Sequence, residues 1–145
     1  MKKTITILGS TGSIGKNTIK VIQQLKDRFD VYGIAANSNV ELLAKQAKEL
    51  NCKKVVCGED YKKGLCSLLA KNTTVACGTE GMIEISTAKE VDMVLCAVVG
   101  TAALLPVLEA FRAGKDIAIA SKEILVMAGE LVMSEAKKHG VKLLP

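Results

Sequence analysis

Three glycines close to the N-terminus constrain the fold of this 145-residue chain more than any other feature. Residues 9–15 read Gly-Ser-Thr-Gly-Ser-Ile-Gly, and they follow the β-branched run Thr4–Leu8, which is typical of a strand. The next stretch, Ser13–Lys26, carries apolar residues at helical spacing. A strand that leads through a glycine-rich turn into a helix presents free backbone N–H groups where a phosphate can bind.

Each glycine of this turn has an expected role. Gly9 permits the tight turn, Gly12 lets the backbone approach a pyrophosphate, and Gly15 lets the helix pack against the strand. Thr11 and Ser13 offer hydroxyl donors beside them. The pattern therefore predicts a dinucleotide-binding turn.

Two other interpretations of this turn compete with the first. A triphosphate-binding P-loop needs four residues between its glycines and a Ser or Thr after its lysine. Here five residues separate Gly9 from Gly15, and Asn17 follows Lys16, so the P-loop is disfavoured. A glycine-rich turn that serves the fold alone, without a ligand, is the structural alternative.

The rest of the chain alternates short apolar runs with helical patterns, which predicts a parallel sheet with helical crossovers. We expect an α/β, Rossmann-like, doubly wound and mainly parallel sheet of about six or seven strands, with helices on both faces. The expected strands are Thr4–Leu8, Val31–Ala35, Lys54–Cys57, Thr74–Cys77, Asp92–Val98, Asp116–Ala120 and Val141–Leu144. The expected helices are Ser13–Lys26, Val40–Leu50, Tyr61–Ala70, Leu104–Ala113 and Glu123–Lys138, with a helical turn over Thr79–Thr87.

The spacing of apolar residues also predicts which helix faces are buried. In the first helix the predicted inner face is Ile14, Thr18, Val21, Ile22 and Leu25. In the second helix Asn39 is the expected N-cap. The inner face of that helix is predicted to be Leu43, Ala47 and Leu50.

Composition excludes several classes of protein. The net charge is +5, but the basic doublets are scattered and only 3% of the residues are aromatic, so a nucleic-acid partner is not expected. No apolar run approaches the roughly 18 residues that a membrane span needs, and the apolar stretch at the N-terminus is too short for a signal peptide. We therefore expect a cytoplasmic protein with no membrane partner.

The cysteines and the single histidine indicate no metal site. Five cysteines occur without zinc-ribbon or dithiol spacing, so they are expected to be reduced, mostly as small core side chains. His139 ends a basic helical segment, where a positive charge suits the helix C-terminus. No metal ligands are assigned in this chain.

The end of the second strand favours NADP over NAD. Enzymes that use NAD usually place Asp or Glu here to bind the ribose hydroxyl. This chain has Ala36, Asn37, Ser38 and Asn39 instead, so no carboxylate repels a 2′-phosphate. No Arg or Lys stands in the segment, and Lys45 is the nearest cation in the sequence. Ordinary turn and capping chemistry is the alternative explanation for these residues.

A third polar patch follows the strand expected at Asp116–Ala120. Ligands of open parallel sheets lie beyond the carboxyl ends of the strands, where Ser121, Lys122 and Glu123 are predicted to lie. Ser121 can cap the next helix and Glu123 suits its first turn. Lys122 is unfavourable at a helix N-terminus, which indicates either a functional role or a tolerated exposed lysine.

Five segments in order resemble one family, the 1-deoxy-D-xylulose 5-phosphate reductoisomerases, over essentially the whole chain. They are Ile-Leu-Gly-Ser-Thr-Gly-Ser-Ile-Gly at 7–15, Asn-Ser-Asn-Val-Glu-Leu-Leu at 37–43, Gly-Thr-Ala-Ala-Leu-Leu-Pro at 100–106, Ala-Gly at 113–114 and Ala-Ser-Lys-Glu at 120–123. The resemblance implies an NADPH-dependent enzyme of the non-mevalonate isoprenoid pathway that uses a divalent metal, Mg²⁺ or Mn²⁺. It also implies a phosphorylated sugar substrate and a homodimeric parent protein.

The resemblance carries roles over to individual residues. It implies NADPH contacts at Thr11, Gly12, Ser13 and Ile14, a ribose-phosphate site at Asn37, Ser38 and Asn39, cofactor contacts at Ser121 and Glu123, and a substrate contact at Lys122. This chain departs from the family twice: Asn37 stands where a glycine is usual, and Ser121 stands where an asparagine is usual. Both departures bear on how the cofactor is oriented.

The resemblance also sets an expectation for domain organisation. Residues 1–145 match the NADPH-binding domain of the family, while the metal-binding acidic loop, the catalytic domain and the C-terminal domain are not matched. We therefore expect a truncated, inactive N-terminal domain with no catalytic residues of its own. One alternative is a stand-alone NADPH-binding module without catalysis, and another is the cofactor half of a different reductase, such as a semialdehyde dehydrogenase.

Overall fold

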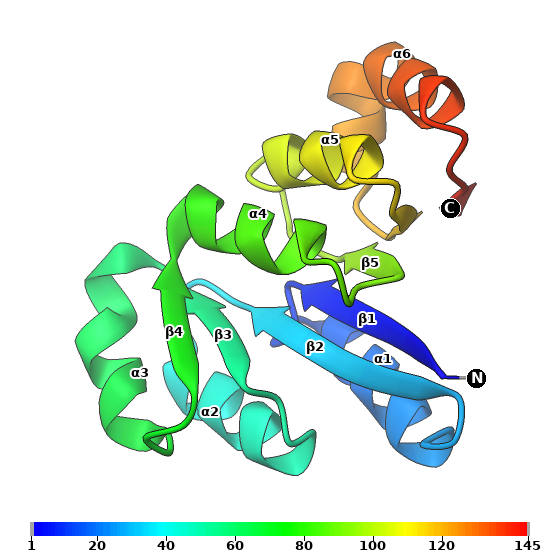
Figure 1. Ribbon diagram of the computed structural model, residues 1–145. Coiled ribbons are helices and arrows are strands. Elements are labelled where there is room, and N and C mark those ends of the chain that lie inside the picture. Colours follow the sequence, from blue (N-terminus) through cyan, green and yellow to red (C-terminus); the bar gives the residue numbers. More distant parts are fainter. Residues whose placement is uncertain (1, 145) are drawn as a thin grey trace.

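The computed structural model describes residues 2–144 and consists of one parallel sheet with helices on both faces (Figure 1). The strands are β1 (Lys3–Leu8), β2 (Phe29–Ala35), β3 (Lys54–Cys57), β4 (Thr74–Cys77), β5 (Met93–Cys96), β6 (Asp116–Ile119) and β7 (Leu143–Leu144). The α-helices are α1 (Ser13–Gln24), α2 (Val40–Glu49), α3 (Lys62–Leu68), α4 (Gly78–Thr87), α5 (Leu104–Arg112) and α6 (Lys122–Lys138). A 3₁₀ helix, η1 (Glu59–Tyr61), precedes α3.

The strand order is β4-β3-β2-β1-β5-β6-β7, and every pair is parallel. The chain builds outward from β1 to β4, and α4 then leads back to β5 on the other side of β1 (Figure 1). The direction of winding therefore reverses between β1 and β5. This arrangement confirms the predicted doubly wound, Rossmann-like fold.

Two apolar clusters hold the layers together, one on each face of the sheet. Helices α1 to α3 cover one face, with Leu43 and Leu65 fully buried among the strand side chains. Helices α4 to α6 cover the other, where Phe111 is the largest fully buried side chain. Because successive strand residues point to opposite faces, Val56 belongs to the second cluster and Cys57 to the first.

The predicted inner face of α1 is confirmed at Ile22 but is wrong at Ile14 and Val21. The buried residues of α1 are Gly15, Ile19 and Ile22, whereas Ile14 and Val21 are exposed. A Cβ on Gly15 would overlap the carbonyl oxygen of Gly9, so α1 rests on the glycine loop at Gly15. That close contact sets the rotation of the helix, and the apolar spacing alone does not reveal it. The inner face of α2 agrees with the prediction, because Leu43 and Ala47 are buried.

Several element boundaries differ from those expected. Residues 78–87 form a regular helix rather than a helical turn, and the segment expected as one helix from Tyr61 divides into η1 and the shorter α3. Strand β5 ends at Cys96, so Ala97 and Val98 belong to the following loop. Helix α6 begins at Lys122, one residue earlier than expected.

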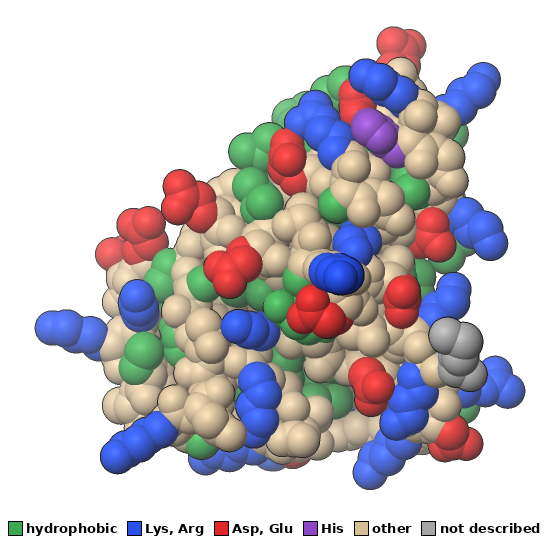
Figure 2. Space-filling view, in the orientation of Figure 1, with side chains coloured by type: hydrophobic (Ala, Val, Ile, Leu, Met, Phe, Trp, Pro, Cys, Tyr) green, Lys and Arg blue, Asp and Glu red, His purple; other side chains and the backbone are tan. Residues whose placement is uncertain are grey.

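On the face shown in Figure 2, Lys and Arg side chains are spread around the molecule and interspersed with Asp and Glu. Within residues 2–144, none of the helices combines the length and the apolar composition of a membrane-spanning helix. The five cysteines are free thiols; Cys52, Cys57 and Cys96 are buried, while Cys66 is exposed and therefore contradicts the expected core role.

Candidate dinucleotide site

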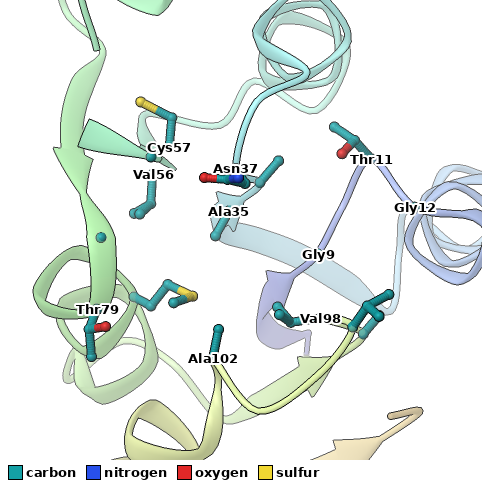
Figure 3. Close-up of a pocket in the computed structure, with 16 residues that line it drawn as sticks. Gly9, Thr11, Gly12, Ala35, Asn37, Val56, Cys57, Thr79, Val98 and Ala102 are labelled. Carbon is teal, nitrogen blue, oxygen red and sulfur yellow. The ribbon is translucent and has the colours of Figure 1, made fainter. Parts of the chain in front are cut away.

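A pocket lies at the carboxyl edge of the sheet, where the winding reverses (Figure 3). Its volume is about 560 Å³, within the range of small-molecule and cofactor sites. Ligands of open α/β sheets bind at this position. The lining residues are Gly9, Thr11, Gly12, Ala35, Ala36, Asn37, Val56, Cys57, Gly58, Gly78, Thr79, Met82, Ala97, Val98, Val99 and Ala102.

Gly9 and Gly15 are required by the packing of the loop. Gly9 has φ +88°, and a Cβ there would lie 2.6 Å from the carbonyl oxygen of Ala97. The end of β1 therefore passes directly against the loop after β5. Gly15 brings α1 onto the same loop, as described above. Both geometries match the structural roles predicted for these glycines.

Gly12 differs because the chain itself leaves space around it. Its φ is −75° and its ψ is 175°, a backbone conformation open to any residue. A Cβ at Gly12 would have only the carbonyl oxygen of Gly9 as a neighbour, at an ordinary 3.7 Å. Gly12 lines the pocket beside Thr11 at the start of α1 (Figure 3). The open backbone at a helix N-terminus fits an anionic group such as a pyrophosphate.

The end of β2 is fixed by its neighbour β3. The backbone N–H of Gly58 donates a hydrogen bond of 3.0 Å to the carbonyl of Asn37, and a Cβ on Gly58 would overlap Oδ1 of Asn37. The two residues thus form one wall of the pocket, and Figure 3 labels Asn37. Asn37 does not have a positive φ, so its presence where the family usually has glycine does not strain the backbone.

The remaining residues after β2 lie outside the pocket lining. Asn39 is the N-cap of α2, and its Oδ1 accepts a 3.3 Å hydrogen bond from the backbone N–H of Leu42. This confirms its expected capping role. Ser38 is exposed. Lys45, the nearest cation in the sequence, lies on α2 with Nζ 4.0 Å from a carboxylate oxygen of Glu49.

The polar patch after β6 lies beside the loop that closes the other end of the pocket. Ser121 Oγ hydrogen-bonds Glu123 Oε2 at 2.7 Å and reaches the carbonyl oxygen of Gly100 at 3.5 Å. Ser121 occupies the N-cap position of α6, but its side chain makes no capping hydrogen bond, contrary to our expectation. The hydrogen bond from Ser121 holds the pKa of Glu123 below its usual value. Lys122 is exposed and begins α6.

Sequence reasoning missed most of the pocket wall, because 11 of its 16 lining residues were not among the predicted site residues. Gly78, Thr79 and Met82 reach it from the start of α4, and Val98, Val99 and Ala102 reach it from the loop after β5. Their positions in the sequence could have indicated them, because both sets of residues lie at or directly after the carboxyl end of a predicted strand. The predicted residues that do not line the pocket are Ser13, Ile14, Gly15, Ser38, Asn39, Ser121, Lys122 and Glu123.

No metal centre is evident in the described residues. Within positions 2–144, His, Cys, Asp and Glu side chains do not come together in a group of three or more that could bind an ion.

The parallel sheet, the reversal point and the glycine loop together define a Rossmann-like domain of the class that binds dinucleotides at this edge. The model of one family, 1-deoxy-D-xylulose 5-phosphate reductoisomerase, matches residues 5–129. The chain belongs to the 1-deoxy-D-xylulose 5-phosphate reductoisomerase family.

Curated relatives agree with this assignment. The reductoisomerase of Clostridium perfringens is 48% identical over 149 aligned residues, which cover 99% of this chain. The reductoisomerase of Thermodesulfovibrio yellowstonii is 44% identical and also covers 99% of this chain. The chain spans only 38% of the length of either relative.

Solved structures show the same relationship. A reductoisomerase crystallised with NADPH, fosmidomycin and magnesium superposes with a TM-score of 0.94 at 40% identity, over 99% of this chain and 36% of that one. The Zymomonas mobilis enzyme in complex with NADPH gives a TM-score of 0.93 at 37% identity, over 100% of this chain and 38% of that one. A biliverdin reductase from Synechocystis, at 18% identity and a TM-score of 0.67, shares the fold alone.

Proposed function

We propose that this chain binds NADPH in the pocket at the reversal point. The observation that carries the proposal is the open backbone of Gly12 at the start of α1, facing a pocket of about 560 Å³. The relatives solved with NADPH belong to the same family and superpose over almost the whole chain. The proposal places the pyrophosphate at residues 9–15 and uses Thr11, Gly12, Ser13 and Ile14 as the contacts implied by resemblance.

The proposal also fixes the direction in which the dinucleotide lies. Its adenosine half lies against the ends of β2 and β3, where Asn37 and Gly58 form the wall and no carboxylate follows β2. Its nicotinamide half lies toward Val99 and Gly100, beside the hydrogen-bonded pair of Ser121 and Glu123. When bound, NADPH supplies a hydride to a substrate held beyond that end. Lys122 is assigned to the substrate side.

The reaction proposed for the whole protein follows from the family. We infer that it rearranges and reduces 1-deoxy-D-xylulose 5-phosphate to 2-C-methyl-D-erythritol 4-phosphate, with Mg²⁺ or Mn²⁺ polarising the oxygens of the substrate. Residues 1–145 are the NADPH-binding domain in this proposal. The metal ligands and catalytic groups are then supplied by residues outside this chain, so the chain alone binds cofactor without turnover. The homodimeric parent and the cytoplasmic location stay predictions.

Calorimetric titration of the chain with NADPH and, separately, with NADH tests the proposal. We expect saturable binding of NADPH at one site and at least tenfold weaker binding of NADH, a difference of about 1.4 kcal/mol. Equal or tighter binding of NADH would overturn the NADP assignment. Binding of neither nucleotide to a chain with native circular dichroism would favour a glycine loop that serves the fold alone.

No Arg or Lys directly follows β2, so we expect Lys62 to supply the positive charge that binds the 2′-phosphate of NADPH. Burial raises the pKa of the Cys57 thiol, and the Lys62 ammonium partly opposes this rise, so its charge acts at the end of β3. Lys62 begins α3, three residues after Glu59 and four after the pocket residue Gly58. Replacing it with alanine should weaken NADPH binding about tenfold and leave NADH binding unchanged, because a phosphate contact is lost.

Lys45→Ala is the matched control for this prediction. Lys45 sits on α2 near Glu49 and does not line the pocket. Titrating both variants with NADPH and with NADH shows whether affinity falls because a contact of Lys62 is lost or because the chain has one positive charge fewer. Equal losses of NADPH affinity in the two variants would contradict the assignment of Lys62.

A further inference from the structure

Two cysteines end neighbouring strands on the adenosine side of the pocket. Cys57 is the last residue of β3 and Cys77 the last of β4, and they are paired directly in the register of the parallel ladder. Adjacent strands lie about 4.8 Å apart, which is within the range of about 4.4–6.8 Å between Cα atoms joined by a disulfide. The backbone therefore already holds the two residues at a distance that a disulfide can span.

Their side chains point to the same face of the sheet. Cys57 belongs to the apolar cluster beneath α2 and α3, and Cys77 packs against that cluster. Burial, followed by the influence of Cys77, raises the pKa of Cys57 to about 12, so Cys57 stays protonated. Cys77 is only partly buried and is therefore the thiol that an oxidant in solution meets first.

We propose that Cys57 and Cys77 are a redox-sensitive dithiol whose oxidation to a disulfide weakens dinucleotide binding. The oxidant is hydrogen peroxide, which attacks at the sulfur of Cys77 and leaves a sulfenic acid and one water. The sulfur of Cys57 then loses its proton as it attacks the sulfur of Cys77, and the hydroxyl group takes up a proton and departs as a second water when the S–S bond forms. Two thiols lose two electrons in total, and one peroxide is reduced to two waters.

The pair is connected to the pocket through the residues that follow each cysteine. Gly58 follows Cys57 and Gly78 follows Cys77, and both glycines line the pocket, as does Cys57 itself. Gly58 also holds Asn37 through its backbone hydrogen bond. A disulfide would therefore fix the ends of β3 and β4 to each other and restrict how the wall formed by Gly58 and Asn37 adapts to a bound dinucleotide. By linkage, a bound dinucleotide that holds this wall in its reduced form must oppose oxidation to the same extent.

The regulatory half of this inference rests on the proposed function, whereas disulfide formation does not. Cys66 on α3 is the nearest competitor, because it is exposed and also influences the Cys57 thiol. Unlike Cys77, it has no ladder pairing with Cys57 in the described sheet. Cys52 and Cys96 are buried at other positions of the fold. These three thiols provide the controls.

The first experiment treats the full chain with hydrogen peroxide and maps its thiols by mass spectrometry. We expect the loss of two hydrogen atoms, a cross-linked peptide pair that contains Cys57 and Cys77, and reversal by dithiothreitol. Cys57→Ser and Cys77→Ser should each abolish the cross-link, while Cys66→Ser should retain it. A Cys66–Cys77 cross-link, or sulfonic acid at Cys77 with Cys57 free, would overturn the pairing.

The second experiment measures NADPH affinity before and after oxidation. Oxidised wild type should bind at least about fivefold more weakly than reduced wild type, with full recovery after reduction. Saturating NADPH should slow cross-linking by a comparable factor. The double variant Cys57→Ser/Cys77→Ser should bind NADPH equally well with and without peroxide, which excludes damage elsewhere.

The outcomes distinguish the inference from the proposed function. If reduced wild type fails to bind NADPH, the proposed function fails, and the cross-link still decides whether the dithiol exists. If reduced wild type binds NADPH and oxidation leaves the affinity unchanged, the regulatory role is wrong. A circular dichroism spectrum of the oxidised chain that matches the reduced spectrum shows that any loss of affinity is not unfolding.

Discussion

Replacing Gly12 with valine should reduce NADPH affinity by about 100-fold, or roughly 2.7 kcal/mol, while leaving the fold intact. The backbone of Gly12 has φ −75° and ψ 175°, which valine adopts without strain. A Cβ there would meet only the carbonyl oxygen of Gly9, at 3.7 Å. The new side chain therefore extends toward the pocket that Gly12 lines, where the pyrophosphate is proposed to lie. Titration calorimetry measures the affinity and thermal unfolding measures the stability.

Gly129→Val is the matched control, because it adds the same side chain outside the pocket. Gly129 lies in α6, and a Cβ there has no neighbour within 4 Å among the described residues. The control should bind NADPH like the wild type. A Gly12→Val variant with native stability and undiminished NADPH affinity would show that the ligand does not pass over this backbone, and the proposed site would be wrong.

The fold could be predicted because its determinants are local. The glycine loop after the first strand and the alternation of strand and helix patterns fix a parallel, doubly wound sheet, as found. Asn39 capping α2 and the buried Leu43 and Ala47 are further local features that the structure confirms. Gly9, Thr11, Gly12, Ala36 and Asn37 line the pocket at the predicted edge, although their contacts with a cofactor stay predictions.

The features that escaped prediction depend on contacts between distant segments. The rotation of α1 is set where Gly15 meets the backbone of Gly9 and Ser10, and its apolar spacing alone suggested a different face. The wall formed by Asn37 and Gly58 depends on the register between β2 and β3, which a single sequence does not specify. Ser121 was expected to cap α6, but its hydroxyl group donates to the carboxylate of Glu123 and its oxygen accepts no backbone N–H of the helix.

Gly9 differs from Gly12 because we expect its replacement to damage the fold itself. Gly9→Ala should lower the free energy of unfolding by about 3–5 kcal/mol, a large part of the 5–15 kcal/mol typical of a domain. An L-residue at φ +88° costs about 1–2 kcal/mol through backbone strain alone. In addition, the Cβ would lie 2.6 Å from the carbonyl oxygen of Ala97 and 2.9 Å from the backbone nitrogen of Val98. Neither backbone atom can move away as a flexible side chain would.

Gly114→Ala separates these two contributions. Gly114 has φ +79°, but a Cβ there has no neighbour within 4 Å in residues 2–144, so this variant carries strain without a clash. Urea unfolding should show a loss of about 1–2 kcal/mol for Gly114→Ala and at least about 2 kcal/mol more for Gly9→Ala. If both variants lose the same free energy of unfolding, the loop after β5 moves to make room for the new Cβ at little cost. The close approach of β1 and β5 would then not set the shape of the pocket, and the position proposed for the pyrophosphate would lose its structural basis.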